Sequence, residues 1–171
     1  QDTAGLNAIL PVKDPAVAAL IGYYRALAAQ RGVTLLVDIR DDMTHLCTNT
    51  YETNKIIGNL LQNAFDELEQ QRDGEQSIEL GIFKRGDACL IRVSNRVADL
   101  EAFSGSCEGV FRQGYTTKAG HDGVGLSSIR ALACKVGGDV SAWLEGDTIH
   151  FIASIPLSGG GDAAAPDTRE G

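Results

Sequence analysis

Apolar residues along the chain recur at two spacings, one typical of amphipathic helices and one typical of half-buried strands. Positions 55–68 read KIIGNLLQNAFDEL, and at about 100° per residue one side of this helix is apolar. The apolar side consists of Ile57, Leu60, Leu61, Ala64 and Leu68. Asn59, Asn63 and Asp66 fall nearly opposite. We therefore predict a helix over 51–71 with an apolar back and a front of amides and a carboxylate.

The two amides on this front are unusual for a solvated helix face. Such a face more often carries Lys, Glu and Arg than two Asn residues of poor helix propensity one turn apart. An Asn side chain offers an acceptor oxygen and two N–H donors without a charge, which suits hydrated Mg²⁺ and a polyphosphate better than proton transfer. Two interpretations are open: a ligand site that uses the amides, and an ordinary half-exposed helix.

The rest of the chain predicts two further helices and five short strands. One helix begins at Pro15 with Asp14 as its N-cap and ends at Gly32, and another covers 124–136. The strands are expected at 33–39, 77–84, 88–95, 139–144 and 148–156, with the last four paired as two hairpins. Because the helices are apolar on one side only, we predict an α/β two-layer sandwich with a mixed, mostly antiparallel sheet covered on one face by helices.

The same patterns predict how the chain is divided. Residues 1–32 form a helical segment that either packs on the domain or is half of a helical hairpin or dimer seam, and 33–157 form the domain. Over 96–122 the hydrophobic periodicity disappears and Gly, Ser and Thr become frequent, which is typical of a lid or binding loop. Residues 158–171 are rich in Gly, Ala and Asp and are expected to be a disordered tail.

Composition and charge narrow the possible partners. The chain has 171 residues, 43% of them hydrophobic, which suffices for one domain with a core of its own. The formal net charge of −8 argues against a nucleic-acid partner and against direct contact with an anionic membrane. Any phosphate ligand must then be held by local N–H donors and a few placed cations. The four cysteines form no CxxC pair, so we expect reduced thiols and no zinc site.

A second stretch, VFRQGYTTKAGHDGVGLSSI over 110–129, carries candidate chemistry. Its glycines lead into a helix whose first N–H groups lack partners within the helix and, with the helix dipole, favour an anion. Lys118 adds a point charge that can fold onto a terminal phosphate. The alternatives are an ordinary loop-to-helix connection and a solvated loop lysine. The expected ligand contacts are Thr116, Thr117, Lys118, Gly123, Val124, Gly125, Leu126 and Ser127.

Together, NLLQNAFDE and the 110–129 stretch resemble the N box, F box and G2 box of the GHKL ATP-binding superfamily. The resemblance covers about 33–157 and is closest to sensor histidine kinases of the quorum-sensing and citrate- or dicarboxylate-sensing subgroups. It implies the Bergerat ATP-binding fold, with Mg²⁺ and ATP under a mobile lid. It also implies the catalytic domain of a two-component sensor histidine kinase, which transfers the γ-phosphoryl group of ATP to a histidine and works with a response regulator.

The resemblance implies a role for each matching residue. Asn63 is similar to the Mg²⁺-binding Asn of the N box, and Asn59 faces the phosphates, with Lys118 as the other catalytic residue. The position of Asn59 is similar to one that, in gyrase-like ATPases, is occupied by a Glu that activates water. An amide cannot take a proton at neutral pH, so Asn59 favours phosphoryl transfer to a side chain over fast hydrolysis. Asp66 either borders the nucleotide or is a solvent-facing carboxylate, and Phe111 is either the F-box residue or a plain lid anchor.

The clearest departure from the superfamily is at the G1 box, which usually reads Asp-x-Gly-x-Gly. This chain has Asn95 followed by Arg, Val, Ala and Asp. We place Asn95 at the adenine, because its carbonyl can accept from an exocyclic amine while its NH₂ donates to a ring nitrogen or water.

A histidine kinase also needs an acceptor histidine on a dimerising helix. The chain has only His45, His121 and His150, which are predicted in a loop, the lid and a strand. We therefore expect the acceptor upstream, in the cytoplasmic portion of a longer, membrane-anchored sensor that forms a homodimer through helices mostly absent here. The fragment alone is then expected to be inactive.

Two other functions stay open. One is a GHKL ATPase whose nucleotide cycle drives a conformational change, which would need a Glu at position 59 and an added transducer domain. The other is a degenerate, kinase-like interaction module that has lost ATP binding together with the G1 glycines.

Overall fold

The computed structural model describes residues 12–69, 71, 74–97 and 124–158. Within them lie three helices and five strands, and each corresponds to a predicted element with bounds that differ by at most two residues. In chain order they are α1 (Pro15–Arg31), β1 (Thr34–Ile39), α2 (Thr50–Glu69), β2 (Ser77–Arg85), β3 (Ala88–Arg96), α3 (Val124–Lys135), β4 (Asp139–Glu145) and β5 (Thr148–Pro156).

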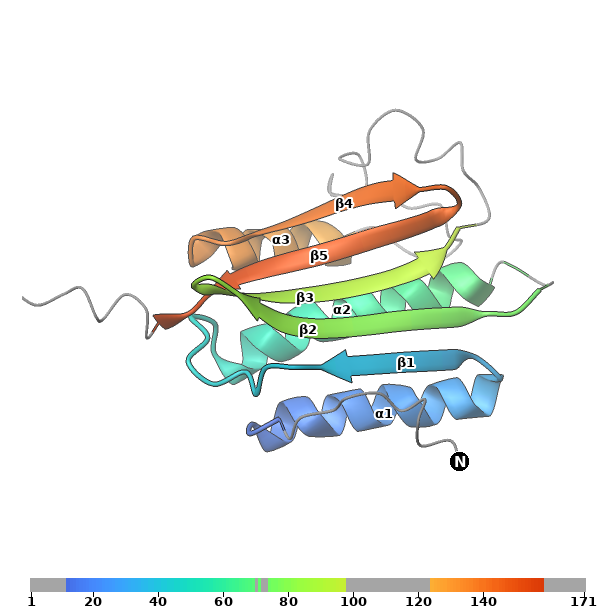
Figure 1. Cartoon of the computed structure of the whole chain (residues 1–171), viewed down its shortest axis with the longest axis horizontal. Coiled ribbons are helices and arrows are strands. Elements are labelled where there is room, and N and C mark those ends of the chain that lie inside the picture. Colours follow the sequence, from blue (N-terminus) through green and yellow to red (C-terminus); the bar gives the residue numbers. More distant parts are fainter. Residues whose placement is uncertain (1–11, 70, 72–73, 98–123, 159–171) are drawn as a thin grey trace, which may run out of the picture.

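The five strands form one sheet in the order β1-β2-β3-β5-β4. β1 runs parallel to β2, and the other neighbours are antiparallel. A tight turn connects the two strands of each hairpin. Gly86 in the β2–β3 turn and Gly146 in the β4–β5 turn have positive φ angles of 62° and 65°. α2 and α3 lie behind the sheet and α1 lies along β1 (Figure 1). The predicted two-layer sandwich with a mixed, mostly antiparallel sheet is confirmed.

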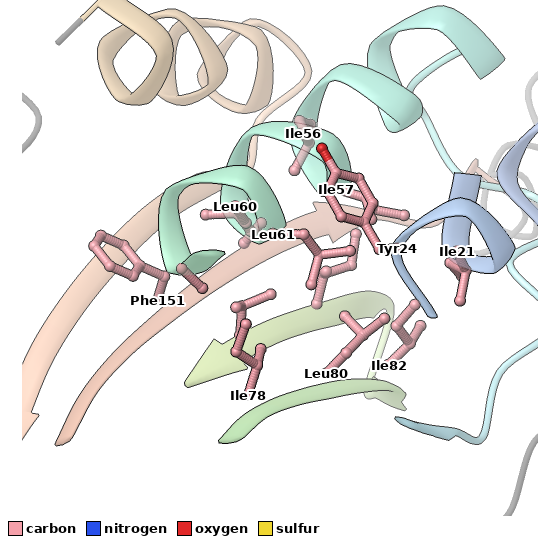
Figure 2. Close-up of a cluster of buried hydrophobic side chains, with 14 of the residues drawn as sticks. Ile21, Tyr24, Ile56, Ile57, Leu60, Leu61, Ile78, Leu80, Ile82 and Phe151 are labelled. Atoms are coloured by element: carbon pink, nitrogen blue, oxygen red, sulfur yellow. The ribbon is translucent and has the colours of Figure 1, made fainter. Parts of the chain in front are cut away.

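The hydrophobic core lies between the helices and one face of the sheet (Figure 2). Alternate residues of β5 point into it, as the period of a strand requires. All five residues of the predicted apolar stripe of α2 are buried, and so are Ile56 and Phe65. The apolar side of α2 is therefore wider than predicted, because the helix contacts both the sheet and α1. Each such fully buried side chain contributes about 1.5–3 kcal/mol relative to exposure.

α1 has the predicted ends and belongs to this core. The Asp14 carboxylate accepts the Ala16 N–H at 2.9 Å, and Gly32 closes the helix with a φ of 71°. The Tyr24 hydroxyl donates to Gln62 Oε1 on α2 at 3.0 Å. Four side chains of α1 are buried in the shared core: Val17, Ile21, Tyr24 and Ala28. Of the two predicted alternatives the structure has α1 packed on the domain, while its origin in a dimerisation hairpin or linker stays a prediction.

Two predicted boundaries move. Arg96 is the last residue of β3 and Val97 is buried, so the first two residues of the segment predicted as a lid over 96–122 belong to the fold, and its residues 98–122 lie outside the described part. The Ser158 N–H donates to the His45 carbonyl at 2.6 Å and its hydroxyl donates to the same oxygen at 3.1 Å. The described fold therefore includes the first residue of the predicted tail, and 159–171 lie outside it.

The buried thiol of Cys89 provides a test of this fold. Burial, and secondarily the Asp41 carboxylate, raises the pKa of Cys89 to about 12. Because the thiolate is the reactive form, we expect N-ethylmaleimide at about pH 8 to leave Cys89 unmodified in the native protein while the exposed Cys47 and Cys134 react. Peptide mass spectrometry after timed labelling measures each site, and labelling in guanidinium is the control. Equal labelling of Cys89 and Cys134 in the native protein would contradict the placement of β3.

Candidate functional site

The polar front of α2 lies on the side of the helix away from its buried stripe, and Asn59, Asn63 and Asp66 are all half-buried there. The Asn59 Nδ2 group donates to the Lys55 carbonyl at 2.7 Å, which orients the amide. Its oxygen then faces α3: a Cβ atom added at Gly125 would lie 2.5 Å from Asn59 Oδ1. The structure thus brings together two of the predicted site residues, and a larger residue at position 125 would displace the Asn59 oxygen.

The first turn of α3 supplies the donors of the candidate site. Its N–H groups have no carbonyl partners within the helix, and the helix dipole makes this end electropositive. Gly125, Leu126 and Ser127 are half-buried there, whereas Ile129 and Ala133 anchor the helix in the core. The start of α3 is therefore held next to the Asn59 amide.

Asn95 lies at the end of β3 and is only 4% exposed. It pairs in register with Ile78 and Ile149, whose side chains are buried under the helices, so Asn95 is on the helix-covered face of the sheet. Its Nδ2 group donates to the Arg96 carbonyl at 2.7 Å. This bond orients the amide, and Oδ1 is the atom that can accept from an exocyclic amine.

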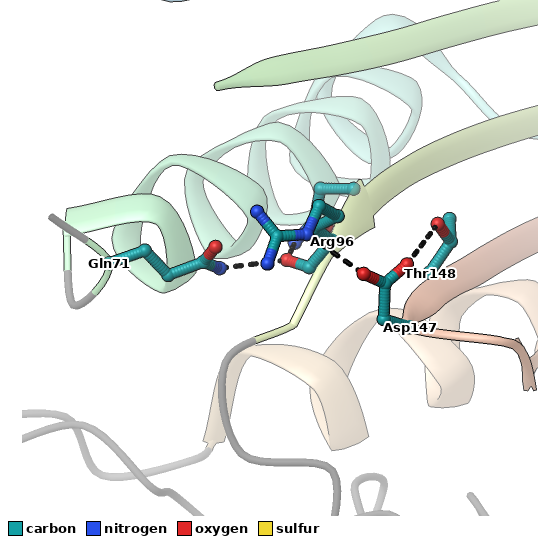
Figure 3. A network of polar contacts seen from close by, with 5 residues as sticks. Gln71, Arg96, Asp147 and Thr148 are labelled. Atoms are coloured by element: carbon teal, nitrogen blue, oxygen red, sulfur yellow. Dashed lines mark hydrogen bonds and ion pairs between the residues drawn. The ribbon is translucent and has the colours of Figure 1, made fainter. Parts of the chain in front are cut away.

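A network of polar contacts fixes the end of β3 (Figure 3). The same Arg96 carbonyl accepts from Gln71 Nε2 at 2.9 Å, just beyond the end of α2. The Arg96 guanidinium pairs with Asp147 at 3.0 Å, and the Val97 N–H donates to the Asp147 carbonyl at 2.9 Å. The end of β3 is thereby tied both to α2 and to the β4–β5 turn, and this holds Asn95 in place.

Asp66 is connected to α1 through Gln62. The Gln62 Nε2 group donates to Asp66 Oδ1 at 3.0 Å, and the Gln62 oxygen accepts from Tyr24. Asp66 is therefore part of a side-chain network on the front of α2. Its predicted role beside the nucleotide stays a prediction.

A second set of contacts joins the beginning of α2 to the end of α3, and the sequence analysis did not identify it. Asn49 and Glu52 form a capping box: the Glu52 N–H donates to Asn49 Oδ1 at 2.8 Å, and the Asn49 N–H donates to Glu52 Oε1 at 3.0 Å. The other oxygen of Glu52 binds Lys135 Nζ at 2.6 Å. This ion pair, followed by the Asn49 N–H, holds the pKa of Glu52 below its usual value. The Asn-x-x-Glu spacing before an apolar run was the available sequence signal for the cap, but nothing in the sequence pointed to Lys135.

The described histidines lie in a loop and a strand, as predicted, and His121 lies outside the described residues. His150 is on the helix-free face of the sheet, where Nδ1 is 2.7 Å from Ser94 Oγ and Nε2 is 3.0 Å from Glu145 Oε1. These residues line a cavity of about 330 Å³ together with Asn95 and Arg96 at the end of β3, whereas Asn59 does not line it. The described part of the chain holds no group of three or more His, Cys, Asp and Glu side chains suited to a metal ion.

One of the remaining predicted ligand contacts, Val124, is the first residue of α3. The others lie outside the described residues and stay predictions: Phe111, Thr116, Thr117, Lys118 and Gly123.

The fold is an α/β sandwich with a mixed five-stranded sheet, and comparison with known proteins gives its family. The GHKL domain model matches residues 49–157, and the chain belongs to that family.

Individual relatives agree with this assignment. The chain is 30% identical over 154 residues to the sensor protein CitS of Halalkalibacterium halodurans, an alignment that covers 85% of this chain and 27% of CitS. It is 30% identical over 125 residues to the sensor histidine kinase CitA of Klebsiella pneumoniae, covering 71% of this chain and 22% of CitA. The chain thus spans about a quarter of the length of the curated relatives it matches.

Among solved structures, the catalytic domain of the histidine kinase ThkA superposes with a TM-score of 0.69 at 16% identity. The match covers 85% of this chain and 95% of that domain, so the two share a fold over nearly the whole of it. In the described parts of this chain, no helix has the length and apolarity needed to span a lipid bilayer.

The close approach at Gly125 predicts an unusual response to a conservative substitution. Gly125→Ala should destabilise the protein by about 0.5–1.5 kcal/mol, because the new methyl group displaces the Asn59 side chain and disturbs its bond to the Lys55 carbonyl. Gly22→Ala is the matched control, since Gly22 is helical with nothing within 4 Å of an added Cβ, and it should stabilise by about 0.5–1 kcal/mol. Thermal unfolding measures both variants.

The clash has a specific partner, so it can be relieved. In an Asn59→Ala background, Gly125→Ala should cost much less, because the oxygen it meets is gone. Equal destabilisation by Gly125→Ala in both backgrounds would contradict the contact between Asn59 and Gly125.

Proposed function

We propose that this chain is the catalytic and ATP-binding domain of a two-component sensor histidine kinase. The observation that carries the proposal is the contact between the Asn59 oxygen and Gly125 in the first turn of α3. It places an uncharged amide beside a helix start whose first N–H groups have no carbonyl partner within the helix, which is a suitable setting for a polyphosphate. Membership in the GHKL domain family supports the same conclusion.

The donor set suits Mg-ATP. Asn63 follows Asn59 by one turn on the same front of α2, and its amide oxygen is a neutral ligand of the kind Mg²⁺ accepts alongside waters and phosphates. When bound, Mg²⁺ would neutralise charge on the phosphates.

The N–H groups of Gly125, Leu126 and Ser127 would bind phosphate oxygens together with Thr116, Thr117 and Lys118. Asn95 would accept from the adenine amine, with Asp66 and Phe111 bordering the nucleotide.

Asn59 determines which chemistry this site favours. An amide has no basic lone pair at neutral pH and cannot deprotonate a water molecule. The site therefore lacks at this position the group that would promote hydrolysis, and the γ-phosphoryl group would instead pass to a histidine. His45 is in a loop, His150 is held between Ser94 and Glu145 on the opposite face of the sheet, and His121 belongs to the predicted lid and lies outside the described residues. None is predicted on a helix that could form a dimer, so we assign the acceptor to a segment outside this chain.

The partners follow from the kinase assignment. ThkA has also been solved in complex with the response regulator protein TrrA; that structure matches this chain with a TM-score of 0.64 at 16% identity, over 85% of this chain and 40% of ThkA. By analogy we propose a response regulator as the protein partner of the full-length sensor. We further propose a cytoplasmic location and a homodimer formed through upstream helices.

Asn63→Ala tests the proposal directly. It should weaken binding of Mg-ATP by at least about 100-fold, because a direct metal ligand is expected to matter more than the outer-shell partners whose loss costs 10–100-fold. Titration calorimetry with ATP and Mg²⁺ measures the affinity of each protein. Asn54→Ala is the control, since Asn54 is on the same helix but its Nδ2 group faces the Ala16 carbonyl of α1 at 3.4 Å.

The alternatives have distinct results in the same experiments. A degenerate module would show no heat with ATP or ADP in the unmodified protein. An ATPase switch would show steady release of phosphate by this chain alone. Undiminished binding by Asn63→Ala would remove the assignment of the metal ligand.

A further inference from the structure

We propose that Glu52 and Lys135 are a positioning pair that holds the start of α3 against Asn59 and thereby sets the affinity of the site for Mg-nucleotide. Neither residue lies in the motifs of the N box or the G2 box. The inference rests on the proposed function, because it concerns the same nucleotide site.

The Glu52 carboxylate makes contacts with both of its oxygens. Its side chain is only 12% exposed, one oxygen accepts the Asn49 N–H at 3.0 Å, and the other accepts from Lys135 Nζ at 2.6 Å. The capping box fixes the carboxylate at the start of α2, so the lysine binds to a group that is already immobile. Lys135 is the last residue of α3, where a cation also interacts favourably with the helix dipole.

The two helices therefore contact each other at both ends of their shared interface. Near the middle of α2, Asn59 meets Gly125 at the start of α3, and at the beginning of α2, Glu52 meets Lys135 at the end of α3. A helix of twelve residues is about 18 Å long, so a small rotation about the buried Ile129 moves its start. Fixing its end to α2 restricts that rotation.

Two further polar contacts join α3 to β4. Arg130 Nε is 2.9 Å from Asp139 Oδ1 and the Cys134 thiol is 3.5 Å from the same oxygen, which ties α3 to β4. The Glu52–Lys135 pair is thus an ion pair that links the end of α3 to the helix carrying Asn59 and Asn63. Since the lysine side chain is 61% exposed, the pair itself contributes little to stability. We expect the pair to act mainly on the position of the start of α3, whereas an ordinary stabilising contact would act mainly on the free energy of unfolding.

Glu52→Gln separates the ion pair from the cap. Gln serves as well as Glu in a capping box, so the cap of α2 is retained and only the charge is lost. Lys135→Met removes the cation with similar side-chain length, and Lys135→Arg retains it. Glu69→Gln is the matched control, because it removes an ion pair of 3.0 Å to Arg31 that joins α2 to α1 instead of α3.

Two readouts are measured on each purified protein at a temperature well below its thermal midpoint. The first is the dissociation constant for ADP with Mg²⁺ by calorimetry. We expect it to rise about two- to fivefold in Glu52→Gln and in Lys135→Met, which is the range that a partly exposed ion pair can produce, and to be unchanged in Lys135→Arg and Glu69→Gln. The second is the amide resonance of Gly125 in the nucleotide-free protein, which should move in the first two variants only.

The outcomes separate the inference from the proposed function. If the unmodified protein binds nucleotide, and Glu52→Gln and Lys135→Met bind it equally well, the inference is overturned and the proposed function stands. The same holds if their thermal midpoints fall while the dissociation constant and the Gly125 resonance stay where they were, because the pair is then structural only. If the unmodified protein itself binds no nucleotide, the proposed function fails and the inference falls with it.

Discussion

The close approach of the Asn59 side-chain oxygen to Gly125 is the contact on which the rest of the site depends. It joins residues 66 positions apart, and a Cβ at position 125 would force the Asn59 side chain to move. The result is a helix start whose N–H donors lie beside an amide that carries no charge. In a chain with a net charge of −8, such local donors are what can hold a phosphate group.

The two sides of α2 have different roles: the apolar side is part of the core, and it holds the polar front in place. Its apolar side is buried against the sheet and α1, with Ile56, Ile57, Leu60 and Leu61 fully covered. Its front is therefore held by the core without any contribution from the ligand, which is the preorganisation that binding requires. The sheet adds Asn95 at the end of β3, fixed by the contacts of the Arg96 carbonyl. The helix-free face carries a separate cluster around His150 and Trp143, whose rings stack at 5.0 Å.

The sequence predicted all the described helices and strands because each depends on local periodicity, a cap or a turn. The polar front of α2 and the glycine-rich start of α3 were also readable locally. Contacts between distant segments were not: the Glu52–Lys135 pair and the burial of α1 depend on how elements pack, and the helical stripe of α1 was equally consistent with a dimer seam. Ser158 was assigned to the tail because its bonds to the His45 carbonyl are also long-range. The roles of Asn63 and Asn95 rest on the family resemblance, and their placement on the helix side of the sheet agrees with it without testing it.

The central claim is that a magnesium nucleotide binds between the front of α2 and the start of α3. Nuclear magnetic resonance of the ¹⁵N-labelled chain, titrated with Mg-ADP and then with Mn²⁺ in place of Mg²⁺, tests it most directly. The account predicts shifts at Asn59, Gly125 and Asn95, followed by selective broadening of the Asn63 side-chain amide by the paramagnetic ion. Shifts confined to His150 and Trp143 on the helix-free face, or broadening that leaves Asn63 sharp, would contradict it.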